Sequence, residues 1–212
     1  MDIAEKIRIA ISKDLPGTDV QWEMASSDRM MHNFPRHRRE NSRIAAILIL
    51  IYPVNNVLNA VFIQRPVYNG IHSGQISFPG GKTEPSDSDI FETALREASE
   101  ETGINPSDVD VLGKLTPLFI PVSDIEVTPV VGWSKTRPAF KIDTNEVVHI
   151  IEVPLTSLAD YSCIREKPFL VRDTEINVKY YDYEGAVIWG ATAMIVHEFL
   201  TIMKTENIGF TL

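Results

Sequence analysis

Residues 78–104, FPGGKTEPSDSDIFETALREASEETGI, place a glycine pair before a predicted helix that carries three closely spaced glutamates. Glu97, Glu100 and Glu101 stand at i, i+3 and i+4, so their carboxylates fall within an arc of about 100° on one helical face. Like charges at this spacing repel one another unless a cation neutralises them. Oxygen ligands suit hard divalent ions, so the pattern predicts a Mg²⁺ or Mn²⁺ site, with a solvated acidic face as the alternative.

The same helix has an apolar arc that predicts packing on a core, made of Ile90, Phe91, Ala94, Leu95 and Ala98. We expect the helix at about 88–102, with candidate N-caps at 86–88 and a left-handed C-cap at Gly103. Gly80 and Gly81 lack side chains, so the backbone before the helix can turn tightly and approach a metal or a phosphate closely.

Gly81, Asp87 and the unbroken run REASEETGI at 96–104 resemble the Nudix box, the signature of hydrolases that act on nucleoside diphosphates linked to another group. The second half of this pattern matches at every fixed position. The first half departs from it, because Asp87 stands where the general pattern has Glu and eight residues instead of seven separate it from Arg96. This departure is similar to the coenzyme A pyrophosphatase branch of the family.

Other segments carry the same resemblance. Upstream, Arg65, His72 and the run GQISFPGG at 74–81 are similar to an extra motif of the branch. One departure lies here, because the branch usually has a Leu-Arg pair shortly before the histidine and this chain has Asn69 and Gly70. Downstream, similar segments lie at 127–132, 146–155 and 189–193.

The pattern of apolar runs predicts an α/β (α+β) protein, and the resemblance implies the Nudix fold, a mixed β-sheet sandwiched between helices. Strands are expected at 44–52, 58–64, 110–117, 126–133, 147–153 and 177–183, with a turn at 53–56. Besides the helix at 88–102, helices are expected at 3–11 and 191–204, with a polar connection at 16–41. Residues 1–42 would form an N-terminal helix and connecting segment packed on a Nudix domain at 43–212.

Composition is consistent with a single-domain enzyme in the cytoplasm. The chain has 212 residues, of which 44% are hydrophobic, enough to bury a sizeable core. Its formal charge of −9 argues against non-specific nucleic-acid binding. No apolar run reaches the length of a membrane span, and the N-terminus lacks a signal-peptide pattern. The predicted partner is a small nucleotide substrate, and a homodimer is one option for assembly.

Hydrolysis of a pyrophosphate requires neutralised phosphate oxygens and a water held in line with phosphorus. Glu97 and Glu101 are the first candidates for metal ligands, Glu100 is the next, and the resemblance adds the Gly81 carbonyl. Arg96 is predicted to orient these carboxylates through a bidentate bond, with a surface salt bridge as the alternative.

The base that activates water is left open at this point. Glu100 is one option, and Asp124, Glu126 and Glu146 are others, although a carboxylate on such a loop or strand end is usually only solvated.

Hydrogen-bond donors near the glycine turn are candidates for phosphate contacts: Arg65, His72, Gln75 and Lys82. For His72, a structural bond to a loop carbonyl is the alternative. The basic run at 35–39 is either a phosphate contact or a solvated loop. Trp189 could stack on a base, although tryptophan is more often a core residue.

Two functions from different classes fit these patterns. The resemblance implies an enzyme that hydrolyses coenzyme A or acyl-coenzyme A to 3′,5′-ADP and 4′-phosphopantetheine or its acyl form, with NADH and ADP-ribose as alternative substrates. The other reading is a catalytically silent Nudix binding module. The intact glutamates favour the enzyme, since a binding module has no physical need to keep like charges crowded together.

Overall fold

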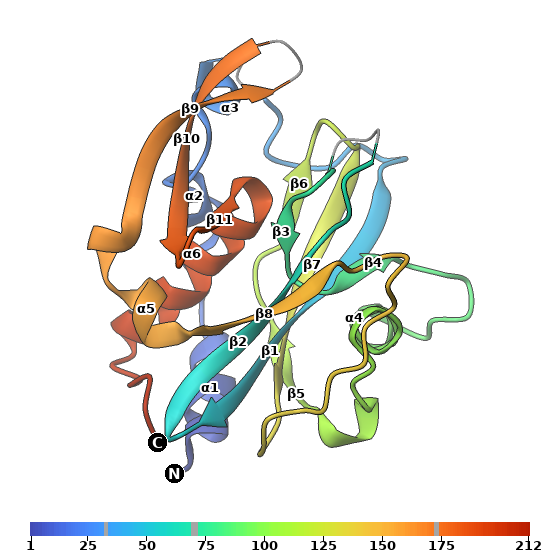
Figure 1. The fold of residues 1–212 in the computed structure, drawn as a ribbon, viewed down its shortest axis with the longest axis vertical. Coiled ribbons are helices and arrows are strands. Elements are labelled where there is room, and N and C mark those ends of the chain that lie inside the picture. Colours follow the sequence, from blue (N-terminus) through green and yellow to red (C-terminus); the bar gives the residue numbers. More distant parts are fainter. Residues whose placement is uncertain (32–33, 69–71, 172–173) are drawn as a thin grey trace.

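The computed structural model describes residues 1–31, 34–68, 72–171 and 174–212 and has a mixed β-sheet with helices on both faces (Figure 1). The sheet order is β3-β2-β1-β7-β5, and β4, β6 and β8 pair with β1, β7 and β2. Strands β1 (Arg43–Val54) and β7 (Ile125–Trp133) are parallel, while β1 and β2 (Val57–Gln64) are antiparallel. The other strands are β3 (Ile76–Ser77), β4 (Gly80–Lys82), β5 (Asp110–Lys114), β6 (Leu118–Ile120) and β8 (His149–Pro154). The predicted α+β class and mixed sheet are confirmed.

Strand β1 supplies side chains to both faces of the sheet. Ile49 and Ile51 belong to the core cluster on one side, whereas Leu48 and Leu50 belong to the cluster on the other. Successive residues of a strand point in opposite directions, so a continuous apolar run is what a strand covered on both faces requires.

The hairpin between β1 and β2 is tighter than the turn predicted at 53–56. Only Asn55 and Asn56 form it, with φ of 49° and 65°, while Pro53 and Val54 belong to β1. Two-residue hairpins of type I′ require positive φ at both central positions, and asparagine tolerates that conformation better than most residues.

Helix α4 (Ile90–Thr102) covers one face of the sheet, and helices α1 (Ile3–Ile11) and α6 (Gly190–Thr205) cover the other (Figure 1). The predicted bounds of α1 are confirmed, and those of α6 differ by one residue at each end. Within the described residues, no helix is long and apolar enough to cross a membrane.

The segment at 16–41, predicted as a polar connection, contains two short helices, α2 (Gly17–Trp22) and α3 (Ser27–Met31). Gln21 and Arg29 are buried there, and Gln21 donates to the carboxylate of Glu198 on α6 at 2.8 Å. Helices of six and five residues are too short to show an apolar period, and such helices depend on tertiary contacts for their stability.

A smaller sheet, β9 (Ile164–Val171), β10 (Thr174–Tyr183) and β11 (Ala186–Trp189), lies beside α6. Strand β9 was not predicted, because it is an edge strand that contains Pro168 and is largely exposed. The remaining elements are α5 (Leu155–Ala159) and the 3₁₀ turns η1 (Pro106–Asp108) and η2 (Tyr161–Cys163).

The ends of α4 are fixed by two caps. The predicted C-cap is confirmed, because Gly103 has a φ of 71° and its N–H donates to the Ser99 carbonyl at 2.8 Å. The N-cap is Asp89, not one of residues 86–88, and its carboxylate accepts from the N–H groups of Phe91 and Glu92 at 2.9 Å. The candidate cap at position 87 is instead bound by the side chain of Arg96.

Gly103→Ala should destabilise the fold by more than backbone strain alone. A Cβ at this position would lie 2.5 Å from the Lys141 carbonyl oxygen, and the left-handed conformation costs an L-residue about 1–2 kcal/mol. Gly185→Ala is the matched control, because Gly185 has a φ of 85° but nothing within 4 Å of the added Cβ. Urea denaturation should show a clearly larger loss for Gly103→Ala, and equal losses would contradict the proposed clash.

Candidate active site

The carboxylate of Glu101 is buried at the junction of α4 and β4, with only 1% of the side chain exposed. It accepts a hydrogen bond from the Gly80 N–H at 2.8 Å and lies 3.3 Å from a guanidinium nitrogen of Arg65. The same Arg65 nitrogen donates to the Gly80 carbonyl at 3.2 Å. The end of β2, the glycine turn and α4 are therefore joined at one carboxylate.

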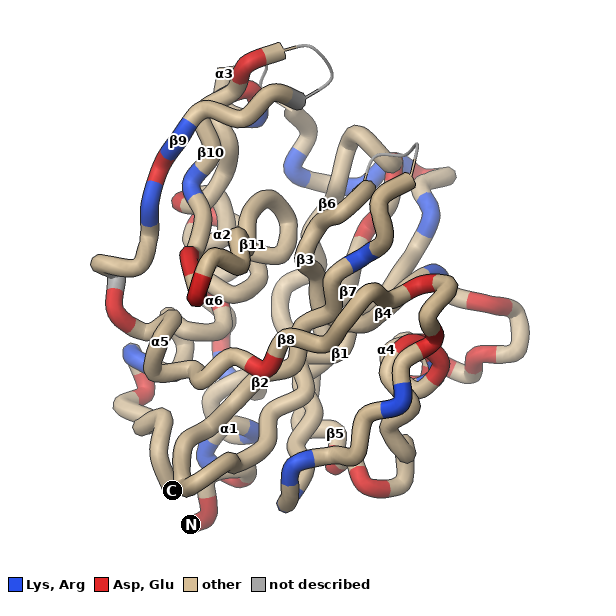
Figure 2. Tube along the Cα trace, viewed as in Figure 1, with Lys and Arg blue, Asp and Glu red and all other residues tan. Residues whose placement is uncertain are grey.

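Glu97 lies one turn earlier on α4, and its carboxylate rests against the backbone of Gly81. A Cβ on Gly81 would overlap this carboxylate, so only glycine allows the approach. The third glutamate, Glu100, differs because 59% of its side chain is exposed. Figure 2 shows that Asp and Glu positions gather along α4 and along the connection that precedes it.

Arg96 connects the acidic groups around α4. Its guanidinium donates to both carboxylate oxygens of Asp87, at 2.8 and 3.0 Å, and to Glu97 and Glu100 at 3.1 Å each. It also donates to the Lys82 carbonyl at 3.0 Å. The bidentate bond expected of Arg96 is thus made with Asp87, while each glutamate receives a single bond. This pairing holds the pKa of Asp87 well below its ordinary value.

Burial dominates the electrostatics of the two inner glutamates. It raises the pKa of Glu101 to about 7, a rise that Arg65 and the Gly80 N–H oppose and that the charges of Glu97 and Glu146 reinforce. Burial also raises the pKa of Glu97, with Arg96 acting against it. The two carboxylates are therefore incompletely neutralised by the protein, and a bound cation would stabilise their charged forms.

Glu97, Glu100 and Glu101 together form what we call the acidic centre. Among the candidate bases, Glu146 is electrostatically linked to this centre, since its charge raises the pKa of both Glu97 and Glu101. It lies in an exposed loop whose N–H groups at Lys141 and Asp143 donate to the last carbonyls of α4, at 2.8 and 3.2 Å.

Two other candidate bases, Asp124 and Glu126, contact side chains outside the acidic centre. Asp124 accepts from the Ser42 hydroxyl at 2.9 Å, and Glu126 pairs with Arg38 at 3.4 Å. Arg36 in the same basic run pairs with Asp19 at 2.7 Å and lies over the Trp22 ring. The run at 35–39 is therefore partly anchored to the fold by these pairs.

The predicted phosphate contacts occupy different places. Arg65 faces the acidic centre, Lys82 is exposed beside it, and the ring of His72 lies 3.0 Å from the side-chain oxygen of Gln75. Asn69 and Gly70, which replace the Leu-Arg pair of the branch, lie outside the described residues.

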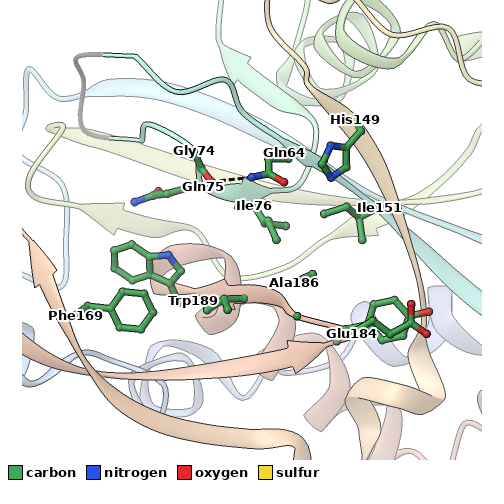
Figure 3. A pocket seen from close by; sticks show the side chains of 13 residues that line it. Gln64, Gly74, Gln75, Ile76, His149, Ile151, Phe169, Glu184, Ala186 and Trp189 are labelled. Carbon is green, nitrogen blue, oxygen red and sulfur yellow. Dashed lines mark hydrogen bonds between the residues drawn. The ribbon is translucent and has the colours of Figure 1, made fainter.

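Sequence reasoning missed part of an open pocket of about 510 Å³ next to this region (Figure 3). Gln75 and Trp189, which the sequence indicated as candidate substrate contacts, line the pocket. Gln64 and His149 also line it, and the sequence did not single them out. Gln64 and His149 are paired in the β2–β8 register, where β2 ends and β8 begins, and the predicted strands at 58–64 and 147–153 contain both residues.

No three His, Cys, Asp or Glu side chains within the described ranges form a ready-made cation site. Arg65 and Arg96 lie against the carboxylates of the acidic centre. The donor set nevertheless fits a hard divalent ion, because Glu97 and Glu101 are carboxylates with raised pKa values beside the side-chain-free Gly81.

The fold and this acidic centre fit a hydrolase of phosphoric anhydrides. Residues 42–161 match the NUDIX domain family, and the chain belongs to that family. It is accordingly a Nudix hydrolase, an enzyme that cleaves nucleoside diphosphate derivatives, and members of the family generally use divalent metal ions.

Two relatives extend the similarity over most of the chain. The uncharacterized Nudix hydrolase NudL of Pectobacterium atrosepticum is 40% identical over 185 residues, covering 85% of this chain and 89% of that protein. The protein of the same name from Photorhabdus laumondii is 36% identical over 166 residues, covering 77% and 87%. Among solved structures, a MutT/nudix family protein from Enterococcus faecalis has the same fold, with a TM-score of 0.53 and 14% identity over 88% of this chain and 73% of that one.

Glu101→Gln should lower turnover by at least about 100-fold while the protein stays folded. The amide still accepts from the Gly80 N–H, but the negative charge that would help to hold a cation is lost. Steady-state kinetics at saturating Mg²⁺ measure the effect. Glu92→Gln removes a charge from the exposed start of the same helix and should leave kcat nearly unchanged. Near-normal turnover of Glu101→Gln would contradict the ligand assignment.

Thermal stability of the metal-free protein should depend on Glu101 in a defined pH window. The pKa of this carboxyl rises from 4.5 to about 7 on folding, so the folded state binds an extra proton between these values. The resulting stabilisation is complete below pH 4.5 and is lost as the pH rises through 7. Scanning calorimetry in EDTA should show that the Tm of the wild type falls relative to the Tm of Glu101→Gln as the pH rises through this window. Equal changes of Tm with pH in the two proteins would rule out the raised pKa of Glu101.

Proposed function

We propose that this enzyme hydrolyses the pyrophosphate bond of coenzyme A or acyl-coenzyme A with Mg²⁺ or Mn²⁺, giving 3′,5′-ADP and 4′-phosphopantetheine or its acyl form. The observation that carries the proposal is the way the upstream motif folds onto the acidic centre. Arg65 donates its backbone N–H to the Gln75 carbonyl at 3.0 Å, and its guanidinium reaches Gly80 and Glu101. The segment that resembles the coenzyme A branch is thereby part of the same site as the Nudix box.

We propose Glu97 and Glu101 as the principal metal ligands, with Glu100 and the Gly81 carbonyl as further ligands. The bound cation would neutralise the phosphate oxygens and the developing negative charge. Arg96 acts as a positioning residue, because its bonds to Asp87, Glu97 and Glu100 fix the spacing of the acidic groups.

We propose Glu146 as the general base. It accepts a proton from the attacking water, the water oxygen forms a bond to phosphorus, and the bridging P–O bond breaks with its electron pair leaving on the second phosphate. Exposure of Glu146 supports this role, since the proton must then pass to solvent. Arg65, His72, Gln75 and Lys82 are the proposed substrate contacts. A homodimer and a cytoplasmic location stay predictions from the sequence.

Coenzyme A should be cleaved with a higher kcat/KM than its 3′-dephospho form. The additional phosphate gains charge-assisted contacts from basic groups such as Arg65 and Lys82, which favours the larger substrate several-fold. The assay compares both compounds with ADP-ribose and NADH at equal Mg²⁺, identifies the products by mass, and uses Glu101→Gln as the inactive control.

Equal kcat/KM values for the two coenzyme A forms, or faster cleavage of ADP-ribose or NADH, would retire the coenzyme A assignment. The hydrolase chemistry would be unaffected by that result. Absence of cleavage for all four compounds with an intact fold would instead point to another nucleoside diphosphate derivative as the substrate.

A further inference from the structure

The open pocket of about 510 Å³ lies between the edge of the central sheet and the β10–β11 hairpin of the smaller sheet. One wall is aromatic. The indole of Trp189 is half-buried and stacks on Phe169, with ring centroids 5.1 Å apart and an interplanar angle of 24°. Figure 3 shows this indole facing the side of the pocket that carries Gly74 and Gln75.

The opposite wall carries hydrogen-bonding side chains. Gln64, Gln75 and His149 line it, and the amide of Gln64 lies 3.5 Å from the Gly74 carbonyl oxygen (Figure 3). A carboxamide presents a donor and an acceptor side by side, the pattern that pairs with the edge of adenine. The pocket thus combines a flat aromatic surface with polar groups that can read the edge of a ring.

The pocket and the acidic centre come close in sequence at two places, the end of β2 and the loop before β8. Gln64 directly precedes Arg65, and His149 follows Glu146 by three residues. Three residues span at most about 11 Å, so each pocket residue lies within that Cα distance of its partner in the centre. Successive residues of a strand point to opposite faces, so Gln64 faces the pocket while Arg65 faces the acidic centre on the other side of the sheet. A nucleotide with its diphosphate at the glutamates would therefore pass around the end of β2 to place its base in the pocket.

We propose that this pocket binds the adenine ring of the substrate, with the base stacked on Trp189 and its edge read by Gln64. This inference rests on the proposed hydrolysis of an adenine-containing diphosphate. It gives a binding place to the base, the part of the substrate that the acidic centre does not hold. An acyl chain fits less well, because it would leave the polar groups of Gln64 and His149 facing apolar surface.

Isothermal titration with ADP and with its hypoxanthine counterpart IDP tests the proposal without requiring turnover. Wild type should bind ADP more tightly than IDP. Trp189→Ala should raise the Kd for both nucleotides about 10-fold, the cost of losing one base-stacking contact, whereas Trp189→Phe keeps a ring and should change it by less than about threefold. Gln64→Leu should abolish the difference between ADP and IDP.

Trp22→Ala is the matched control, because Trp22 is also half-buried but lies on α2, outside the pocket lining. It should leave both Kd values unchanged. A photoreactive probe, 8-azido-ADP, gives a second readout on wild type alone, and its label should map to peptides containing Phe169 or Trp189. Labelling confined to other peptides, or an unchanged Kd in a folded Trp189→Ala variant, would overturn the proposal.

Failure of the pocket assignment and failure of the proposed function are separable. If coenzyme A is cleaved but Trp189→Ala binds ADP as wild type does, only the pocket assignment falls. If coenzyme A is not cleaved but ADP binding depends on Trp189, the substrate assignment falls and the adenine site stands.

Discussion

Burial of the Glu101 carboxylate is the constraint on which the acidic centre depends. A carboxylate taken out of water is costly unless hydrogen bonds and opposite charge replace its hydration. The Gly80 N–H and Arg65 provide that replacement, and they come from the glycine turn and from the end of β2. The hydrogen bonds that stabilise this one buried carboxylate thus hold the end of β2, the glycine turn and α4 together. Because this compensation is incomplete, the pKa of Glu101 stays raised, and a cation bound beside it would stabilise the charged carboxylate.

Arg96 solves a related problem on the outer side of the helix. Its planar guanidinium has donors enough to serve Asp87, Glu97 and Glu100 together, which a lysine ammonium could not do with the same geometry. Asp87 is also held by the Glu84 N–H and the Thr93 hydroxyl, so the long connection before α4 is tied to the helix at a single carboxylate. The connection can therefore contain one more residue than the general Nudix box and still bring the carboxylate of Asp87 to Arg96.

The parts of the fold that follow from local pattern were predictable. Strand β1 is a continuous apolar run, helix α4 has a helical apolar period, and the C-cap at Gly103 follows from glycine chemistry. Helices α2 and α3 were missed because tertiary contacts, not their own sequence, stabilise them, and β9 was missed because an exposed edge strand has little apolar pattern. At the site, the three glutamates were recognisable from spacing alone. The link between Glu146 and the acidic centre depends on a loop held by the α4 carbonyls. The pairing of Gln64 with His149 depends on the register of the sheet. Neither arrangement is encoded in a short sequence motif.

The pocket is assembled from two stretches of chain with different relations to the family. Gln64, Gln75 and His149 lie inside the matched region 42–161, whereas Phe169 and Trp189 lie beyond it, in the smaller sheet. Among the described residues, the hydrogen bonds of Glu97, Glu100 and Glu101 include none with that sheet. Substitutions in the β10–β11 hairpin would consequently reshape one wall of the pocket at little cost to the glutamates. If the pocket holds the base as proposed, natural variation or a designer could alter selectivity there independently of catalytic power.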